Sequence, residues 1–227
     1  MVEKGKQQEM NRRTRVKMCG TTTVHDASEA VLAGVDALGC IFAEKSPRCV
    51  SVARAKEIAA CLPPFVDLVG VFVDHDELEV AAIVREVGLS HVQLHGSESP
   101  DFCRRISCAV MPQCKVIKAF RLGSKSRKED FDGYNAVVSG FLLDTYVEGQ
   151  KGGTGEIFDW TLVEKLKLQR PVILAGGLRL ENVVEAIRMV RPFAVDVNSG
   201  IETSPGIKDH KKLRGFIRQV HHADGGL

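Results

Sequence analysis

The chain has 227 residues, of which 44% are hydrophobic and 26% charged, the ordinary composition of a soluble globular protein with one large domain or two small ones. Its 31 lysines and arginines nearly balance its 29 aspartates and glutamates, so the net charge of +2 gives no reason to expect a nucleic-acid or membrane-surface partner. Because no stretch approaches about 18 consecutive apolar residues and the first residues lack an apolar leader, we expect a cytoplasmic protein without a membrane span.

The seven cysteines are an odd number and are scattered along the chain. They form no CxxC pairs and have no histidines at zinc-binding spacing, which disfavours both a disulfide framework and a structural metal. We therefore expect reduced thiols.

Short apolar segments rich in β-branched residues recur along the chain at fairly even intervals. Because they are apolar nearly throughout, rather than alternating with polar residues, they predict buried parallel strands. The eight predicted strands cover residues 15–20, 37–43, 67–73, 91–96, 115–120, 140–145, 171–177 and 194–200.

Helical patterns lie between these strands. Apolar residues at the spacing of one helix face predict a helix in each of three segments, where the pattern runs over residues 80–87, 180–187 and 213–220. Gly88 is expected to end the first of them, and Asp159 to cap a helix that begins at Trp160. Residues 121–137 have poor apolar periodicity, so the fifth helix is expected to be partly irregular.

Eight strands alternating with helices in little over 200 residues suit a closed barrel better than an open doubly wound sheet. The predicted fold class is therefore α/β, a single (β/α)8 TIM barrel over residues 14–222. Residues 1–13 are expected to be a polar N-terminal extension and residues 223–227 a C-terminal tail. No second domain is predicted.

In such a barrel the active site is expected at the C-terminal ends of the strands. Polar groups and glycines stand at five of these ends. They are Cys19 on the first strand, His95 on the fourth, Asp144 on the sixth, Gly176 and Gly177 on the seventh, and Asp196, Asn198, Ser199 and Gly200 on the eighth.

Several segments around these positions form an ordered set: KMCG (17–20), IFAEKSPR (41–48), VQLHG (92–96), LLDT (142–145) followed by GGTGEIFDW (152–160), ILAGGL (173–178) and VDVNSGIETSPGIKD (195–209). Their order and spacing resemble the phosphoribosylanthranilate isomerase family, over residues 15 to about 218. AGGL occurs in many phosphate-binding barrels, but KMCG, KSPR and NSGIETSPGIKD together are highly specific. One small departure is Cys49, which follows KSPR where the family commonly has an aromatic residue.

The resemblance implies that Cys19 is the general base that removes the proton from the sugar C2′ and that Asp144 is the general acid that protonates the furanose ring oxygen. Lys17 shares a strand face with Cys19, and a nearby cation favours the thiolate. The apolar residues before Asp144 suggest a buried carboxyl group, and burial would keep it protonated. For the other six cysteines we expect structural thiols.

Phosphate binding is predicted at the two turns that follow the seventh and eighth strands. Backbone N–H groups of Gly176, Gly177, Ser199 and Gly200 are expected to approach the phosphate, helped by the N-terminus of a short helix that begins near Ile201. Phosphate sites after these two strands recur in this architecture. Simple turn chemistry is the alternative explanation of the glycines.

Three further side chains are expected to bind substrate. Arg48 is implied by the resemblance to pair with the anthranilate carboxylate through its planar fork of donors. Asp196 is implied to contact the substrate as well. His95 either contacts substrate or satisfies a hydrogen bond inside the barrel, and the sequence leaves both readings open.

The implied reaction is the Amadori rearrangement of N-(5-phosphoribosyl)anthranilate to 1-(o-carboxyphenylamino)-1-deoxyribulose 5-phosphate, a step of tryptophan biosynthesis. An acid, a base and an anion site suffice, so no metal or organic cofactor is required. The related isomerase of the histidine pathway is disfavoured by Cys19, because that enzyme has an aspartate at the end of its first strand. A catalytically silent phosphate-binding barrel is disfavoured because both acid and base are present. Monomer and homodimer remain open.

Overall fold

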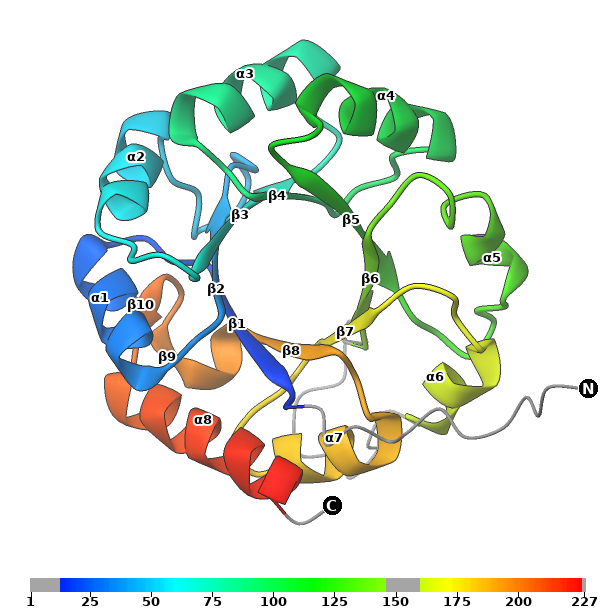
Figure 1. Ribbon diagram of the computed structural model, residues 1–227. Helices are drawn as coiled ribbons and strands as arrows, with labels where there is room; N and C mark the ends of the chain where they lie inside the picture. The colour runs from blue at the N-terminus through cyan, green and yellow to red at the C-terminus, as the bar shows by residue number, and fades with distance from the viewer. Residues whose placement is uncertain (1–12, 146–159, 226–227) are drawn as a thin grey trace, which may run out of the picture.

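The computed structural model describes residues 13–145 and 160–225, and within them eight parallel strands form a closed barrel surrounded by helices (Figure 1). The strands pair in chain order, and β1 closes the ring by pairing with β8. This confirms the (β/α)8 fold. The strands are β1 (Arg15–Cys19), β2 (Ala37–Ile41), β3 (Asp67–Phe72), β4 (His91–Leu94), β5 (Lys115–Arg121), β6 (Gly140–Asp144), β7 (Val172–Ala175) and β8 (Ala194–Val197).

The helices follow the strands and form the outer layer. Their bounds are α1 (Val24–Ala33), α2 (Val52–Ala60), α3 (Glu77–Val87), α4 (Pro100–Val110), α5 (Glu129–Asp132), α6 (Thr161–Leu166), α7 (Val183–Val190) and α8 (His210–Gly225). Several begin where the sequence offers a side-chain cap; Ser99, for example, accepts a hydrogen bond from the Phe102 N–H ahead of a proline at the first helical position. Gly88 ends α3 as expected, with φ of 76°. The fifth helix is a single turn, in agreement with its weak periodicity.

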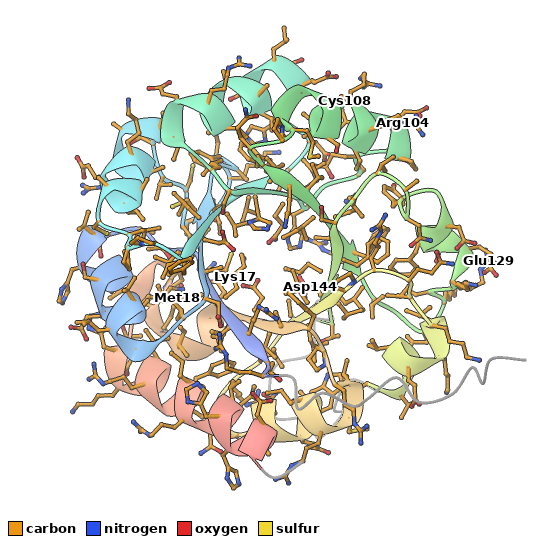
Figure 2. The ribbon with its side chains drawn as sticks, in the orientation of Figure 1. Lys17, Met18, Arg104, Cys108, Glu129 and Asp144 are labelled. Atoms are coloured by element: carbon orange, nitrogen blue, oxygen red, sulfur yellow. The ribbon has the colours of Figure 1, made fainter. Side chains whose placement is uncertain are left out.

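Alternation along each strand divides the side chains between two cores. On β1, Val16 and Met18 are fully buried among the residues that pack the strands against the helices, whereas Cys19 belongs to a small cluster inside the barrel with Ile41 and Val71. Figure 2 shows Lys17 and Asp144 on the inner side of the strand ring. The inward face of β1 therefore carries Lys17 and Cys19 toward the barrel axis.

Helix α7 begins at Val183, so Leu180, the first residue of its apolar pattern, precedes the helix. One expected boundary was wrong. Helix α8 runs to Gly225, so the predicted tail at 223–227 is helical in its first three residues. The reason is packing: Ala223 is fully buried, and Asp224 accepts hydrogen bonds from the Thr14 N–H and hydroxyl at 2.8 and 2.7 Å, which ties the last helix to the start of β1.

The structure adds elements that the apolar pattern did not indicate. A 3-10 turn (Ser199–Ile201) follows β8, and a short antiparallel pair, β9 (Glu202–Ser204) and β10 (Ile207–Lys208), precedes α8. These strands are too short for a hydrophobic period to be seen. Asp159 and the GGTG segment lie outside the described residues.

Among residues 13–145 and 160–225, no helix combines the length and the apolar character needed to span a membrane. The seven cysteines all lie in the described ranges, and all are free thiols.

Candidate active site

The predicted acid, Asp144, ends β6, and a histidine, His95, directly follows β4; the two side chains approach each other at the same end of the barrel. His95 Nε2 lies 3.6 Å from Asp144 Oδ2, slightly beyond normal hydrogen-bond length. The other ring nitrogen of His95 is 3.0 Å from the side-chain amide nitrogen of Gln93. The Asp144 side chain is 22% exposed, so this carboxyl group stands at the mouth of the barrel with partial access to water, in contrast to the burial expected from the apolar residues before it.

Cys19 is enclosed at the end of β1. It is 5% exposed. Gly39, its parallel neighbour on β2, has no side chain, and an added Cβ there would lie 3.0 Å from both the Cys19 Sγ and the Lys17 Nζ. The thiol and the ammonium group therefore share the space that this glycine leaves free.

Lys17 is held by a carboxylate from the last strand. Its Nζ lies 2.9 Å from Asp196 Oδ1, and the two side chains are 4% and 8% exposed. Parallel pairing of β1 with β8 sets Lys17 directly opposite Asp196. The structure thus places Asp196 inside the barrel beside Cys19, bound to a cation.

The ionisation of Cys19 reflects this mixed environment. Burial raises the pKa of the thiol, Lys17 and Lys208 lower it, and Asp196 raises it further; the net pKa lies above its ordinary value. The pKa of Lys17 is also raised, because attraction to Asp196 and Cys19 outweighs the cost of burying the ammonium group. Lys17 does favour the thiolate, as expected, but the favourable effect is smaller than that of burial.

Arg48 is anchored by a buried glutamate that the sequence did not single out. Its Nε and Nη2 donate to Glu202 Oε1 and Oε2 at 2.9 and 2.7 Å, a bidentate pair. Lys208 Nζ also donates to Glu202 Oε1 at 2.9 Å and to Asn198 Oδ1 at 2.9 Å. Glu202 therefore ties the loop after β2 to the hairpin after β8, and the Nη1 edge of Arg48 is the edge that remains for a ligand.

These contacts leave Glu202 strongly acidic. Burial alone raises its pKa, but hydrogen bonds and charges from Arg48 and Lys208 lower it from an ordinary 4.5 to about 2. A folded-state pKa below the unfolded value means that the carboxylate stabilises the fold above about pH 4.5 and that this contribution is lost as pH falls toward 2.

Glu202→Gln is expected to lower the free energy of unfolding by about 3 kcal/mol at pH 6, because it leaves the buried Lys208 and the partly buried Arg48 without their carboxylate. The deficit relative to wild type should shrink between pH 6 and pH 3, where the wild type begins to lose the same contribution. Urea unfolding at both pH values measures it, with the exposed Glu57→Gln as a control near zero. A deficit that is equal at both pH values contradicts the assignment.

The two predicted phosphate turns touch each other. Gly176 and Gly177 have φ of 87° and 65°, the left-handed region that favours glycine. At Gly200 an added Cβ would lie 2.0 Å from the Leu178 carbonyl oxygen, so only glycine lets the turn after β8 approach the turn after β7. Ser199 opens the 3-10 turn and is exposed, as is Gly177. The expected helix thus starts two residues before Ile201 and is a single 3-10 turn.

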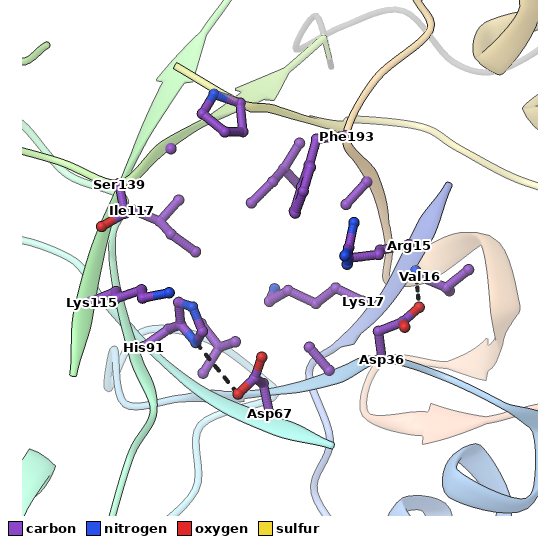
Figure 3. Close-up of a pocket in the computed structure, with 16 residues that line it drawn as sticks. Arg15, Val16, Lys17, Asp36, Asp67, His91, Lys115, Ile117, Ser139 and Phe193 are labelled. Atoms are coloured by element: carbon purple, nitrogen blue, oxygen red, sulfur yellow. Dashed lines mark hydrogen bonds and ion pairs between the residues drawn. The ribbon is translucent and has the colours of Figure 1, made fainter. Parts of the chain in front are cut away.

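A cavity of about 250 Å³ lies at the opposite end of the barrel. Figure 3 shows side chains from the starts of the strands around it, among them Arg15, His91 and Lys115. His91 Nδ1 lies 3.9 Å from Asp67 Oδ1 there. Cys19 and Asp144 stand at the other ends of their strands and do not line this cavity, whereas Lys17 lies between the two regions and lines it.

Sequence reasoning did not single out Glu202 and Lys208. Both lie in the NSGIETSPGIKD segment. The available signal was a glutamate and a lysine within a segment that also supplies the predicted phosphate turn. Their burial is visible only in the folded chain, at 8% and 5% exposure.

Comparison with known proteins gives one consistent result. A family model described as N-(5′-phosphoribosyl)anthranilate (PRA) isomerase matches residues 16–219. The N-(5′-phosphoribosyl)anthranilate isomerase of Pseudomonas fluorescens (strain SBW25) is 46% identical over 216 residues, covering 94% of this chain and 98% of the relative.

Two solved structures are similar in fold and sequence. One is described as monomers generated from the dimeric phosphoribosylanthranilate isomerase of Thermotoga maritima, with a TM-score of 0.78 and 37% identity, covering 92% of this chain and 98% of that chain. The other is a phosphoribosylanthranilate isomerase in complex with reduced 1-(o-carboxyphenylamino)-1-deoxyribulose 5-phosphate, with a TM-score of 0.77 and 38% identity, covering 92% and 99%.

Proposed function

The chain belongs to the N-(5′-phosphoribosyl)anthranilate isomerase family, and from that premise we propose how its residues divide the work of the reaction. It is an aldose–ketose isomerase of tryptophan biosynthesis. The reaction converts N-(5′-phosphoribosyl)anthranilate to 1-(o-carboxyphenylamino)-1-deoxyribulose 5-phosphate without net oxidation. The residue assignment rests on one observation. The Cys19 thiol beside Lys17, the partly exposed Asp144 carboxyl group and the two glycine turns all lie at one end of the barrel.

Asp144 is assigned as the general acid. Its proton goes to the furanose ring oxygen, the bond between that oxygen and C1′ breaks, and the sugar opens to a protonated Schiff base. Partial exposure lets the carboxyl group reach a bound substrate and regain a proton from solvent. His95, 3.6 Å from Asp144, is assigned to orient this carboxyl group. Its position beside the carboxyl group supports that role.

Cys19 is assigned as the general base. Its thiolate takes the proton from C2′, and the electron pair of that C–H bond forms the enolamine, which tautomerises to the ketone. The enclosed position of the Sγ keeps water away from the thiolate. The positive charges of Lys17 and Lys208 lower the pKa of the thiol and so stabilise the thiolate.

Arg48 is assigned to the anthranilate carboxylate through its free Nη1 edge. Glu202 holds the other edge, so the guanidinium is oriented before substrate arrives. Gly20 assists, because an added Cβ there would lie 2.7 Å from the Arg48 Cδ. The glycine thus lets the arginine side chain lie across the end of β1.

The phosphate is assigned to backbone N–H groups of the two glycine turns. Gly177→Val is expected to raise KM about tenfold or more with the fold intact, because valine disfavours the φ of 65° that orients these N–H groups. An added Cβ at Gly177 would meet no atom of residues 13–145 and 160–225 within 4 Å, so the expected effect does not come from a clash with these residues. Steady-state kinetics measures the effect, and Lys167→Ala, outside the turns, serves as the control. An unchanged KM removes Gly177 from the phosphate site.

A direct assay tests the activity itself. Freshly generated phosphoribosylanthranilate is mixed with the protein, and loss of anthranilate fluorescence is followed. A related aldose–ketose isomerase of the histidine pathway or a silent phosphate-binding barrel gives no such loss. We further propose that the enzyme acts in the cytoplasm as a monomer or homodimer, which sedimentation at several concentrations distinguishes.

A further inference from the structure

The charge environment of Cys19 is unusually crowded for a buried thiol. Five titratable or charged groups interact with it, and they come from five different segments of the chain. They are Lys17 on β1, Cys40 on β2, Arg48 in the loop after β2, Asp196 on β8 and Lys208 on β10. Glu202 in turn forms ion pairs with two of these cations, Arg48 and Lys208.

Lys17 and Asp196 form a separate unit within this set. Their side chains meet at 2.9 Å, and both are almost entirely buried, at 4% and 8% exposure. Figure 3 shows Lys17 reaching from β1 toward the centre of the barrel. A lysine has three donors on a flexible stem, so a fixed partner is needed to hold its ammonium group in one place.

The location of this pair relative to Cys19 follows from the strand register. Lys17 lies two residues before Cys19 on the same face of β1, and Asp196 lies opposite Lys17 on β8. An added Cβ at Gly39 would lie 3.0 Å from both the Lys17 Nζ and the Cys19 Sγ, so these two atoms lie close to each other. Asp196 therefore acts on the thiol in two ways: it holds the cation beside the sulfur, and it offsets that cation's charge.

We propose that Asp196 is a positioning residue, the counter-ion that holds the Lys17 ammonium group beside Cys19 and sets how readily the thiol gives up its proton. The inference rests on the proposed role of Cys19 as base. It differs from the substrate contact that family resemblance implied for Asp196. In this arrangement the carboxylate acts on the substrate only through Lys17 and Cys19.

Removing the charge of Asp196 and removing that of Lys17 are expected to shift the pH at which Cys19 loses its proton in opposite directions. In Asp196→Asn the amide oxygen still accepts a hydrogen bond from the Lys17 ammonium group, so the cation stays beside the sulfur, its charge is no longer offset, and the thiolate forms at lower pH. Without Lys17, the thiolate loses a cation and keeps a nearby anion, so it forms at higher pH. General loosening of the barrel would instead expose the thiol and move both variants toward an ordinary thiol, near pH 8.5.

The test is the pH dependence of iodoacetamide modification at Cys19, measured by mass spectrometry of the peptide that contains it. Wild type, Asp196→Asn, Lys17→Met and the double variant are compared. Asp196→Asn is expected to lower the midpoint by about one pH unit, equal to a roughly tenfold faster reaction at pH 7, and Lys17→Met to raise it by a similar amount. In the double variant the effect of Asp196→Asn should largely disappear.

Glu98→Gln is the matched control. Glu98 lies 3.1 Å from Lys118, and the two side chains are 2% and 3% exposed, so the pair is as buried as Lys17–Asp196, but Glu98 lies in the loop after β4 and Lys118 on β5. This variant should leave the Cys19 midpoint unchanged. Circular dichroism and the unfolding free energy of each variant verify that the barrel is retained.

Two results overturn the proposal: an unchanged midpoint in Asp196→Asn, and a shift of both single variants in the same direction. If the midpoint is unchanged and Asp196→Asn also loses affinity for reduced 1-(o-carboxyphenylamino)-1-deoxyribulose 5-phosphate, Asp196 is a substrate contact. Because alkylation is measured without turnover, these results are independent of whether Cys19 is the catalytic base, which kinetics of Cys19→Ser decides separately.

Discussion

Cys19→Ser is expected to lower kcat by about 10² or more while changing KM only modestly. Serine keeps the approximate size and hydrogen bonding of the side chain, but its hydroxyl group is far too weakly acidic to serve as an unaided base. Because burial raises the pKa of Cys19 above its ordinary value despite two nearby lysines, activity of the wild type should rise with pH through the thiol ionisation. Steady-state kinetics from pH 6 to pH 10 measures both effects.

Alkylation provides the control for this assignment. Iodoacetamide should inactivate the wild type, and the reduced product analogue should protect it, whereas the residual activity of Cys19→Ser should be insensitive. The modified peptide must be identified, because Cys49 and Cys108 are exposed and will also react. A serine variant that is as active as wild type and equally sensitive to alkylation places the base elsewhere.

Asp144→Asn is expected to lower kcat by about 10² to 10⁴, the usual contribution of general acid catalysis, and to leave binding of the product analogue largely intact. Asparagine fills the same volume and keeps a contact with His95, but it cannot deliver a proton to the ring oxygen. The measurement is kcat under conditions where chemistry limits turnover, together with the dissociation constant of the analogue.

His95→Gln separates the acid from its neighbour. If His95 only orients the carboxyl group, which lies 3.6 Å away, this variant should lose less activity than Asp144→Asn and should retain its pH profile. A near-native kcat in Asp144→Asn would show that another group protonates the ring oxygen.

Much of this site was predictable because of a general property of parallel barrels. Eight apolar segments predicted eight strands, and all parallel strands end at the same side of the barrel. Cys19 and Asp144 were therefore expected near each other although they lie far apart in the chain. The motifs then suggested which chemistry these groups carry. Boundaries were less predictable, since the last turn of α8 depends on a hydrogen bond from Thr14 to Asp224.

By itself, the sequence determined the fold class, the strand positions and the residue types at the strand ends, because hydrophobic period and order along the chain are local properties. Only the tertiary structure decided which charges meet. The Lys17–Asp196 pair joins residues 179 positions apart, and the Arg48–Glu202 pair joins residues 154 positions apart. Such pairs exist only when β8 closes against β1. The ionisation of Cys19 depends on its burial and on these partners, so it too is a property of the closed barrel.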